Sequence, residues 1–372
     1  FEVSHLADDR ILVSFETGGY ETGCEPYDPP CAKTGFRVLE PDGTDDAEIL
    51  TEYAYPIRNA DSSENHGVDR IGESAFVVAD MEHERVFTVE NGTVTWQWNA
   101  SELYTPPADP TRHDWLHIND VDAINDTHYL VSVRNAHQIV VLERGTGVVE
   151  IINEDEDDSN DGRCAEALFG GDDGDVRCGD PSVLERQHNP QWLGDGAVLV
   201  ADSDNDRVVE LHRNETTGAW EPAWAVNEAA GVGFHWPRDA DRLPNGNTLV
   251  TDTFNSRVVE IAPNGSVVWS VDTFHLPYEA DRLPYGEPVG APQYDNGTVA
   301  GPGNRIPFVS KAVIGIRGEF AFVPVWFGAA HLVGVALGVF IVLVGGVYGG
   351  GAYLYRTRRA TRTSGSAPTS ED

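Results

Sequence analysis

Residues 234–270 read FHWPRDADRLPNGNTLVTDTFNSRVVEIAPNGSVVWS and contain a complete structural module. The pattern predicts four short strands, over residues 239–243, 247–252 and 257–262 and a last one that ends at Trp269. Asn-Gly pairs at 245–246 and 264–265 supply turns, since this pair between apolar runs is a strong hairpin signal. Four short strands without an intervening helix are the size of one β-propeller blade.

The same module recurs along the chain, and each copy opens on a histidine. The opening histidines are His66, His117, His188, His235 and His275. The last copy begins HLPYEADRLPYG and repeats the HWPRDADRLPNG of the copy before it, although its remainder through Gly301 is degenerate. Repeats of this kind cannot bury their faces alone and therefore stack into a ring.

Two further strands are expected near the N-terminus, over residues 11–16 and 36–40. They would form or complete one more blade beside the copies that open on histidine. We therefore predict an all-β fold, a β-propeller with six blades, and keep five blades as the alternative. A β-sandwich fits less well, because sandwiches do not repeat a unit of this length.

An almost wholly apolar segment lies near the C-terminus, over residues 321–355. Its charge-free part exceeds the roughly 20 residues that cross a bilayer, and aromatic residues flank both ends. Arg356, Arg358, Arg359 and Arg362 follow directly, and positive charges of this kind stay on the cytoplasmic side. A buried core helix is the alternative to a membrane span.

These features predict three parts: an extracellular propeller over residues 1–310, a transmembrane helix with its flanks over 321–355, and a short cytoplasmic tail over 356–372. The protein would lie in the cell membrane with a single span. Gly334 and Gly338 form a GxxxG pair that permits packing against a second span, as in a homodimer. The sequence starts at Phe1 without an initiator Met, and we expect an export signal or an anchor ahead of it.

The charge balance is strongly acidic. The chain has 61 acidic and 25 basic residues and a formal net charge of −36, and its only lysines are Lys33 and Lys311. A hydrophobic content of 40% and regular strand patterns argue against a disordered acidic chain. At 1 M salt the Debye length falls to roughly 3 Å and surface repulsion is screened, so we predict a halophilic protein. No basic face is available for phosphates, and we expect no nucleic-acid partner.

Four cysteines fall in two close pairs, Cys24 with Cys31 and Cys164 with Cys178. Each pair closes a short loop rich in Gly, Pro or acidic residues and lacks metal-ligand spacing. We predict two local disulfides formed in an oxidising compartment, with free thiols as the alternative. Asn-x-Ser/Thr triplets agree with an exported glycoprotein. Their asparagines are Asn91, Asn99, Asn125, Asn214, Asn264 and Asn296.

The histidines that open the copies indicate where a functional site would lie. In a propeller the innermost strand of every blade lines the central channel, so equivalent residues converge at one mouth. A single histidine is more often a turn or packing residue, but a histidine in every copy favours a shared site. Such a cluster can bind a metal, act as bases or supply a nucleophile.

The residues around two of these histidines narrow the choice. His117 stands in LHIND, followed by Asn119 and later by Arg134 in SVRN, and His188 stands in QHNP. In this order and spacing the chain resembles the arylsulfate sulfotransferases, the PAPS-independent arylsulfotransferase family, over about residues 65–270. It looks like a haloarchaeal-type, membrane-anchored member. The resemblance implies a propeller in which a channel histidine takes a sulfuryl group from an aryl sulfate and passes it to a phenol.

The same resemblance implies roles for individual residues. His188 would be the nucleophile, His117, Asn119 and Arg134 would hold the sulfuryl oxygens, and His66 would be a further channel histidine. From the repeat itself, and not from the resemblance, His235, Arg238 and His275 are expected at the channel wall, where they would bind substrate. Sulfuryl transfer spreads negative charge over oxygens, so a site for it needs cations and hydrogen-bond donors. The expected partners are a small aryl sulfate and a phenol, with no cofactor and no metal.

Two other interpretations stay open from the residues alone. One is a non-catalytic extracellular propeller that binds a glycan or a protein through the same channel mouth, because a fold does not establish a function. The other is a metal-dependent lyase or hydrolase that uses the ring of histidines. We lean towards an enzyme, an arylsulfate sulfotransferase.

Overall fold

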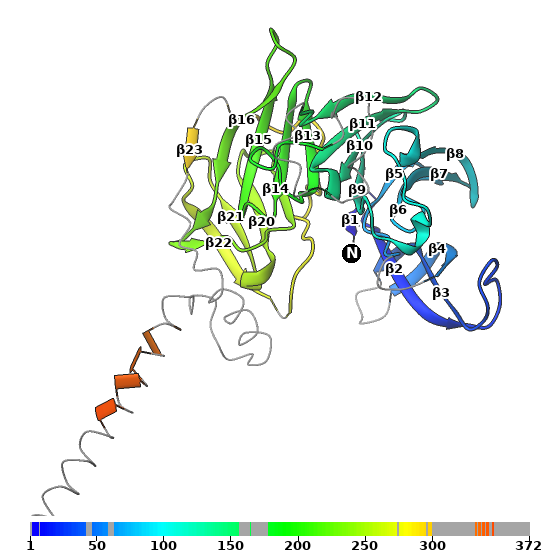
Figure 1. The fold of residues 1–372 in the computed structure, drawn as a ribbon, viewed down its shortest axis with the longest axis horizontal. Coiled ribbons are helices and arrows are strands. Elements are labelled where there is room, and N and C mark those ends of the chain that lie inside the picture. Colours follow the sequence, from blue (N-terminus) through cyan, green and yellow to red (C-terminus); the bar gives the residue numbers. More distant parts are fainter. Residues whose placement is uncertain are drawn as a thin grey trace, which may run out of the picture. The chain divides into compact units, whose positions relative to one another are not determined.

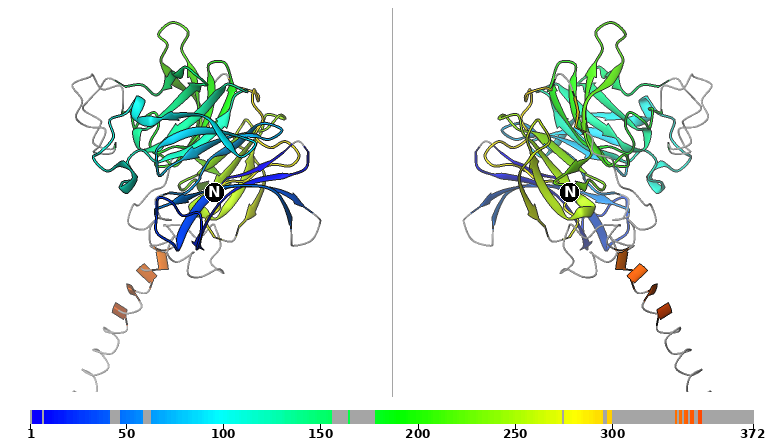
Figure 2. Two further views of the ribbon diagram at one scale, coloured as in Figure 1. Left: turned by 90° about the vertical axis from the view of Figure 1, so that its right-hand side faces the viewer. Right: turned by 90° about the vertical axis from the view of Figure 1, so that its left-hand side faces the viewer.

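The computed structural model describes residues 2–299 except Ala7, 42–46, 59–62, 156–163, 165–177, Phe274 and 295–296, together with scattered positions between 332 and 345. The chain forms two compact units, Phe1–Gly303 and Asn304–Asp372. The first unit contains all the strands of the described chain (Figures 1 and 2).

Five sheets of four antiparallel strands each form the first unit, and in each the strands pair in chain order. Blade 1 contains β1 (Val3–His5), β2 (Ile11–Tyr20), β3 (Cys31–Pro41) and β4 (Ala47–Ile57). Blade 2 contains β5 (Val68–Gly72), β6 (Ala75–Asp80), β7 (Arg85–Glu90) and β8 (Thr93–Asn99). Blade 3 contains β9 (Ile118–Ala123), β10 (His128–Val133), β11 (Gln138–Glu143) and β12 (Gly147–Ile152).

Blade 4 contains β13 (His188–Gly194), β14 (Ala197–Asp202), β15 (Arg207–Arg213) and β16 (Trp220–Val226), and β23 (Gly297–Val299) joins it in parallel to β16. Blade 5 contains β19 (Asp239–Arg242), β20 (Thr248–Asp252), β21 (Arg257–Ile261) and β22 (Val267–Asp272). A short hairpin, β17 (Glu228–Ala229) with β18 (Val232–Gly233), lies between these blades in the chain. Short 3-10 turns are η2 (Ala100–Glu102), η3 (Pro110–Arg112), η4 (Arg134–Ala136) and η7 (Thr253–Asn255).

The all-β propeller predicted from the sequence is confirmed, and the four strands expected in the opening stretch correspond to β19–β22. The expected count of six blades is wrong for the described residues, and the alternative of five is right. The copy that opens on His275 contributes no four-stranded sheet, because its sequence after Pro284 no longer follows the strand-turn pattern.

Residues 278–282 of that last copy nevertheless take the place of an inner strand. The side chains of Glu279 and Asp281 accept backbone N–H groups of Val3 and His5 in β1, at 3.0 and 2.6 Å. On the other side, Asp239 of β19 accepts the N–H of Ala280 at 3.0 Å. This segment therefore bridges the inner strands of blades 5 and 1 and closes the ring.

Apolar clusters between neighbouring blades hold the ring together. In β6, Phe76 and Val78 pack with blade 1, whereas Val77 and Ala79 pack with blade 3. Successive side chains of a strand point to opposite faces of its sheet, so a strand that is apolar throughout buries both faces. The same alternation in β14 places Val198 against blade 3 and its neighbours against blade 5.

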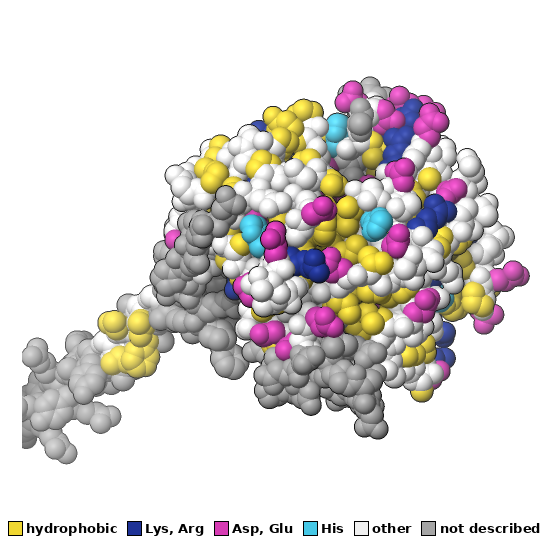
Figure 3. All heavy atoms as spheres, turned by 90° about the horizontal axis from the view of Figure 1, so that it is seen from above, with side chains coloured by type: hydrophobic (Ala, Val, Ile, Leu, Met, Phe, Trp, Pro, Cys, Tyr) yellow, Lys and Arg dark blue, Asp and Glu magenta, His cyan; other side chains and the backbone are white. Residues whose placement is uncertain are grey.

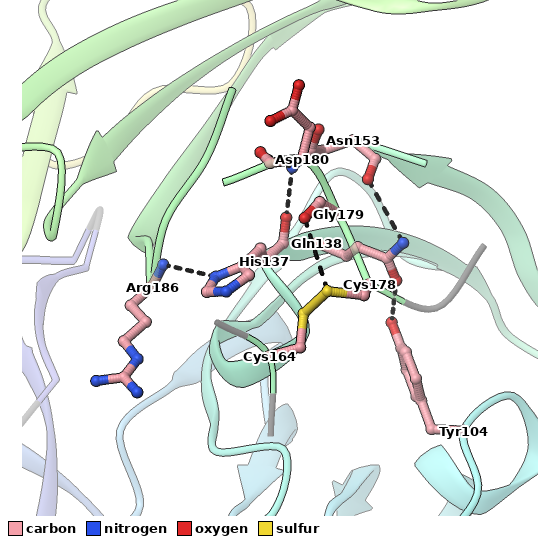
Figure 4. Close-up of a disulfide and its surroundings, with 9 residues drawn as sticks. All are labelled: Tyr104, His137, Gln138, Asn153, Cys164, Cys178, Gly179, Asp180 and Arg186. Carbon is pink, nitrogen blue, oxygen red and sulfur yellow. Dashed lines mark hydrogen bonds between the residues drawn. A yellow bond between two sulfur atoms is a disulfide. The ribbon is translucent and has the colours of Figure 1, made fainter. Parts of the chain in front are cut away.

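Both predicted disulfides are formed, Cys24 with Cys31 and Cys164 with Cys178. The second one lies beside a hydrogen-bonded turn that leads into blade 4 (Figure 4). In this turn the N–H of Gly179 donates to the carbonyl of Ala136 at 2.8 Å, and a Cβ on Gly179 would lie only 2.4 Å from the Asn153 side chain. The disulfide therefore joins two residues of the segment that connects β12 to β13.

The second unit is described only at scattered positions. Those positions between 332 and 345 are helical, and apolar side chains such as Val335, Phe340 and Ile341 are exposed there. Within the described chain, no helix has both the length and the apolar character needed to cross a membrane. Most of the predicted span over 321–355, and the whole tail over 356–372, lie outside the described residues.

Carboxyl groups of the inner strands β9 and β19, with those of Glu2 and Glu279 beside the inner strands, lie close together in the channel. Burial raises the pKa of Glu2 to about 8 and that of Asp239 to about 7, and it also raises the pKa of Asp120, Asp241 and Glu279. Repulsion among these groups adds to the shifts. Several of them accept backbone N–H groups of the next inner strand, as Asp239 does, which explains their presence in the channel.

The channel carboxyls predict how stability depends on pH. The folded state keeps protons on Glu2 and Asp239 at pH values where the unfolded chain has lost them, so the free energy of unfolding falls as pH rises towards 8. The pKa of His66 is lowered to about 4, so this residue makes the free energy of unfolding rise with pH, but only up to its ordinary pKa of 6.5. We therefore expect a net fall between pH 6.5 and 8, measured by denaturant unfolding at constant salt. Asp239→Asn, which mimics the protonated carboxyl, should flatten this slope, whereas exposed Glu21→Gln should not; a slope that is unchanged in the first variant would contradict the prediction.

Candidate functional site

A repeated turn between the second and third strands sets the register of the blades. Residues Asp80 and Arg85 face each other there in blade 2, as do Asp202 with Arg207 in blade 4 and Asp252 with Arg257 in blade 5. Each pair forms an ion pair at 2.7 Å. Blade 3 has Val133 and Gln138 instead, and it is this blade that carries Arg134, directly after Val133. Blade 3 therefore has an arginine at this turn that is not part of the repeated ion pair.

The residue before the third strand in this turn holds the next blade in place. Glu84 accepts the backbone N–H of His117 at 2.7 Å, His137 accepts that of Arg186 at 3.1 Å, and Asp206 accepts that of Trp236 at 2.7 Å. All three donors have a positive φ, between 48° and 54°. At these three junctions an equivalent hydrogen bond therefore fixes where the chain enters the inner strand of the next blade, and it places His117 and Trp236 at equivalent positions.

A second set of equivalent residues lies two positions after the N–H donors of the junctions, as Asn119 does after His117 and Arg238 does after Trp236. Strand register places Asp69, Asp122, Gln191 and Asp241 at one level of the inner strands, each paired with the residue three before the repeated turn. Three residues before them stand His66, Asn119, His188 and Arg238. Tyr278 is equivalent to Arg238, because Tyr278 precedes EADR as Arg238 precedes DADR.

These two levels meet in one cavity of about 150 Å³ at a mouth of the channel. Its walls are formed by Glu64, His66, His117, Arg134, His188, Trp236, Arg238 and Tyr278. Four blades and the segment after β22 contribute to it, so the cavity exists only because the ring closes.

His188 is held in one tautomer. Its Nδ1 lies 3.1 Å from the carbonyl oxygen of Arg186 and 2.7 Å from Oγ of Ser203. The Ser203 hydroxyl itself donates to the carbonyl of Pro237 at 2.6 Å. A carbonyl oxygen can only accept, so Nδ1 of His188 carries the proton and Nε2 keeps its lone pair. Burial, with Arg134 and Arg238 nearby, keeps the pKa of His188 well below its ordinary value, so the ring is neutral at neutral pH.

Two guanidinium groups give the cavity its positive charge. Nε of Arg134 and Nε of Arg238 are buried without a hydrogen-bond partner among the described residues. Arg238 is also held between two rings, with its guanidinium 4.1 Å from the Trp236 ring and 4.6 Å from that of Tyr278. Buried donors that the protein leaves unpaired are suited to a ligand that brings acceptors, and the charge favours an anion.

Aromatic rings of the cavity pack against one another, and His188 meets Trp236 and Tyr278 edge-on. His66 lies flat between Tyr278 and His117, with ring centroids 5.1 and 5.6 Å apart. Trp236 stacks on Phe254 at 4.4 Å, and its indole N–H donates to Asp204 at 2.9 Å. These contacts make the walls rigid and leave an aromatic edge at the mouth, where a flat apolar group fits.

The structure brings together part of the predicted site. His66, His117, Arg134, His188 and Arg238 line the cavity. Asn119 lies behind it, fully buried, and donates to the carbonyl of Gln187 at 2.9 Å, so it contacts the backbone that leads to His188.

His235 and His275 do not line the cavity, although they open their copies. The histidines are not in register: His235 and His275 stand three residues before Arg238 and Tyr278, which occupy the lining level. His235 instead packs edge-on against Phe254 at 5.3 Å, and His275 is exposed. The shared initial His of the copies is therefore not a shared position in the channel.

Glu64, Trp236 and Tyr278 are lining residues that the sequence did not reveal. The signal that would have found Trp236 is its distance from the repeated turn, which equals that of His117 in its own blade. Tyr278 follows from the HLPYEADR repeat once Arg238 is known to line the cavity. Within the described chain, no group of three or more His, Cys, Asp or Glu side chains is arranged to hold a metal ion.

The fold and the site together define a β-propeller with a buried, uncharged imidazole beside two guanidinium groups at its channel mouth. Residues 51–222 match the model of the arylsulfotransferase (ASST) family, under half of the 372-residue chain. The match supports the assignment of this family. It includes His66, His117, Arg134 and His188, whereas Arg238 lies beyond it.

Solved structures of other proteins are more distantly similar to this chain. A catalytically inactive virginiamycin B lyase from Staphylococcus aureus, with quinupristin, has 10% identity and a TM-score of 0.36 over 58% of this chain, and the chain spans 57% of its length. The WD40 propeller domain of Doa1 has 10% identity and a TM-score of 0.40, covering 69% of this chain and 72% of that one. A periplasmic gluconolactonase from Pseudomonas aeruginosa has 11% identity and a TM-score of 0.38, covering 74% and 85%. No curated protein matches the chain. We draw nothing about activity from such remote similarity.

The two guanidinium groups predict anion binding at the cavity. Arg134→Gln and Arg238→Gln should each weaken the binding of inorganic sulfate by about tenfold or more, since a charge-assisted hydrogen bond contributes about 1.5–3 kcal/mol. Isothermal titration calorimetry at fixed ionic strength measures this. Arg213→Gln is a matched control, because Arg213 is 52% exposed and pairs with Glu150 away from the cavity. Equal affinities in all three variants would mean that sulfate does not occupy this cavity.

Proposed function

We propose that this protein transfers a sulfuryl group from an aryl sulfate to a phenolic acceptor through a sulfo-histidine at His188. The observation that carries the proposal is the state of this imidazole. Nδ1 donates to Arg186 and Ser203, and Nε2 keeps a lone pair at a neutral ring inside the cavity. A nucleophile must be unprotonated at the attacking atom, and here the protein enforces that condition.

The groups around His188 suit a sulfuryl group. Arg134 and Arg238 lie beside it with unpaired Nε–H groups, and His117 lines the same cavity. In the transfer the charge spreads over the sulfuryl oxygens, where fixed cations stabilise the transition state. Trp236 and Tyr278 offer ring faces or edges for the aryl group.

Each half of the reaction exchanges one bond to sulfur for another. Nε2 of His188 attacks sulfur, the bond from sulfur to the aryl oxygen breaks, and its electron pair stays on that oxygen. A base then takes the proton of an acceptor phenol as its oxygen attacks the same sulfur, and the electron pair of the N–S bond returns to Nε2. The family match over residues 51–222 supports arylsulfotransferase activity in general, and the sulfo-histidine at this position is the finer part of the proposal.

The reaction can be tested on the protein in high salt. We expect release of 4-nitrophenolate from 4-nitrophenyl sulfate when a phenol is present, followed by absorbance. His188→Ala should lower the rate on the order of 10³-fold or more, because the nucleophile itself is lost. Incubation with the donor alone should add one sulfuryl group to the tryptic peptide that contains His188, detected by mass spectrometry.

The control variant is His235→Ala, at a histidine that opens its copy but does not line the cavity. It should keep the activity of the wild type. No turnover by the wild type with several acceptors would favour the alternative, a propeller that binds a glycan or a protein. Turnover without a modified His188 would agree with sulfuryl transfer but would contradict a sulfo-histidine at this residue.

The same proposal places the propeller outside the cell, anchored by residues 321–355, in an organism that accumulates or lives in salt. The apolar segment, the arginines after it and the Asn-x-Ser/Thr triplets support the location. Both disulfides agree with an oxidising compartment. Acidic side chains spread over the face seen in Figure 3, where basic ones are few, and they support function in concentrated salt.

The salt dependence and the anchor give a direct test. Raising KCl from about 0.1 to about 3 M should raise the melting temperature, because the Debye length falls to roughly 3 Å or less and surface repulsion is screened. The full chain should stay with membranes after an alkaline wash, and a chain ending at residue 320 should not. A melting temperature that falls with salt would contradict adaptation to concentrated salt. A full chain that washes off the membranes would contradict the anchor.

A further inference from the structure

Asp114 contacts His117, one of the residues that line the cavity. Both of its carboxylate oxygens lie 2.7 Å from Nδ1 of His117, and its side chain is 39% exposed. Because a carboxylate accepts, Nδ1 of His117 is the protonated nitrogen, and Nε2 is left for a ligand. A carboxylate in this position holds the tautomer of an imidazole and stabilises the imidazolium that forms when Nε2 takes a proton.

The three imidazoles of the cavity differ in their partners. His188 donates to a carbonyl and a hydroxyl, which carry no charge and leave it suited to attack. His66 has a carboxylate partner, Glu64 at 3.0 Å, but its ring lies flat between two others and its side chain is only 6% exposed. His117 has both a carboxylate and an open side, with 16% exposure. It is therefore the imidazole that is equipped to exchange a proton with a substrate.

The backbone fixes this arrangement. The N–H groups of Leu116 and His117 donate to one carboxylate oxygen of Glu84 at 2.9 and 2.7 Å, and that of Ile118 donates to the other at 3.0 Å. Asn135 also holds the loop, since its side chain donates to the carbonyl of Asp114 at 3.2 Å. Both partners of the Asp114–His117 pair are thus held from the backbone, which is what a pre-organised acid–base pair requires.

We propose that Asp114 is a positioning residue that makes His117 the proton carrier of the transfer reaction, an inference that rests on the proposed function. When the bond from sulfur to the aryl oxygen breaks, protonated His117 gives its Nε2 proton to that oxygen and a neutral phenol leaves. When the acceptor phenol attacks sulfur, Nε2 of His117 takes its proton, while the N–S electron pair returns to His188. The proton lost in the first half is regained in the second.

Charges around His117 suit both directions of this exchange. Burial lowers the pKa of His117, the hydrogen bond to Asp114 opposes this, and Arg134 adds to the lowering, so the free ring is neutral and able to accept a proton. A bound sulfate ester brings a negative charge and favours the imidazolium. Burial acts to raise the pKa of Asp114, but the hydrogen bond and attraction from His117, with Arg134, outweigh it, so the carboxylate stays ionised.

The test compares two donors. The leaving group of phenyl sulfate is phenolate, which is strongly basic and needs a proton. The leaving group of 4-nitrophenyl sulfate is 4-nitrophenolate, which is weakly basic and does not. Asp114→Asn should slow transfer from phenyl sulfate on the order of 10²-fold, and transfer from 4-nitrophenyl sulfate by less than about tenfold. Asp109→Asn, at an exposed residue earlier in the same loop, should leave both rates unchanged.

A second variant keeps the test decisive if the first one fails to fold. His117→Gln should give the same dependence on the leaving group, and adding Asp114→Asn to it should cost nothing more, because both act through one imidazole. Equal losses with both donors, or losses that multiply in the double variant, would overturn the inference. If the wild type itself shows no sulfuryl transfer, it is the proposed function that fails; if the wild type is active and the losses are uniform, only the inference on Asp114 fails.

Discussion

Hydrogen bonds at three of the blade junctions determine the geometry of the channel mouth. The residue before the third strand, Glu84, His137 or Asp206, accepts the backbone N–H of the residue that enters the next blade. Since the donor has a left-handed backbone conformation, the chain turns sharply there and sends the following residues down the channel. Apolar packing between blades supplies the cohesion, but it does not by itself select which side chains meet. The junction hydrogen bonds do.

The channel has guanidinium groups at its mouth and buried carboxyl groups on its inner strands. At the mouth, Arg134 and Arg238 surround neutral imidazoles, and further in the inner strands present carboxyl groups whose pKa burial and mutual repulsion raise. Those carboxyls serve the ring by accepting backbone N–H groups of neighbouring strands. An anion that enters the mouth therefore meets the two guanidinium groups beside His188, whereas the raised pKa of the inner-strand carboxyls keeps protons on them.

Much of the fold followed from the repeat. Asn-Gly turns and alternating apolar residues predicted β19–β22 closely, and the same pattern predicted a ring. The number of blades did not follow, because residues 278–282 repeat the inner strand in sequence but have no outer strands to pair with in the described chain. Sequence similarity among the copies predicts where an inner strand lies, because the carboxyl groups of this strand must reach the next inner strand. It does not report whether a complete sheet is built around it.

The sequence by itself determined the alternation that buries both faces of each blade, the two disulfides, and the motif residues His117, Arg134 and His188. Only the tertiary structure decided which residues face the cavity. Equivalence in a propeller is set by strand register and by distance from the repeated turn, so Arg238 and Tyr278, and not His235 and His275, share the level of His66 and His188. The tautomer of His188 was likewise out of reach of the sequence, because Ser203 and the carbonyl of Arg186 meet its ring only through the folding of blade 4.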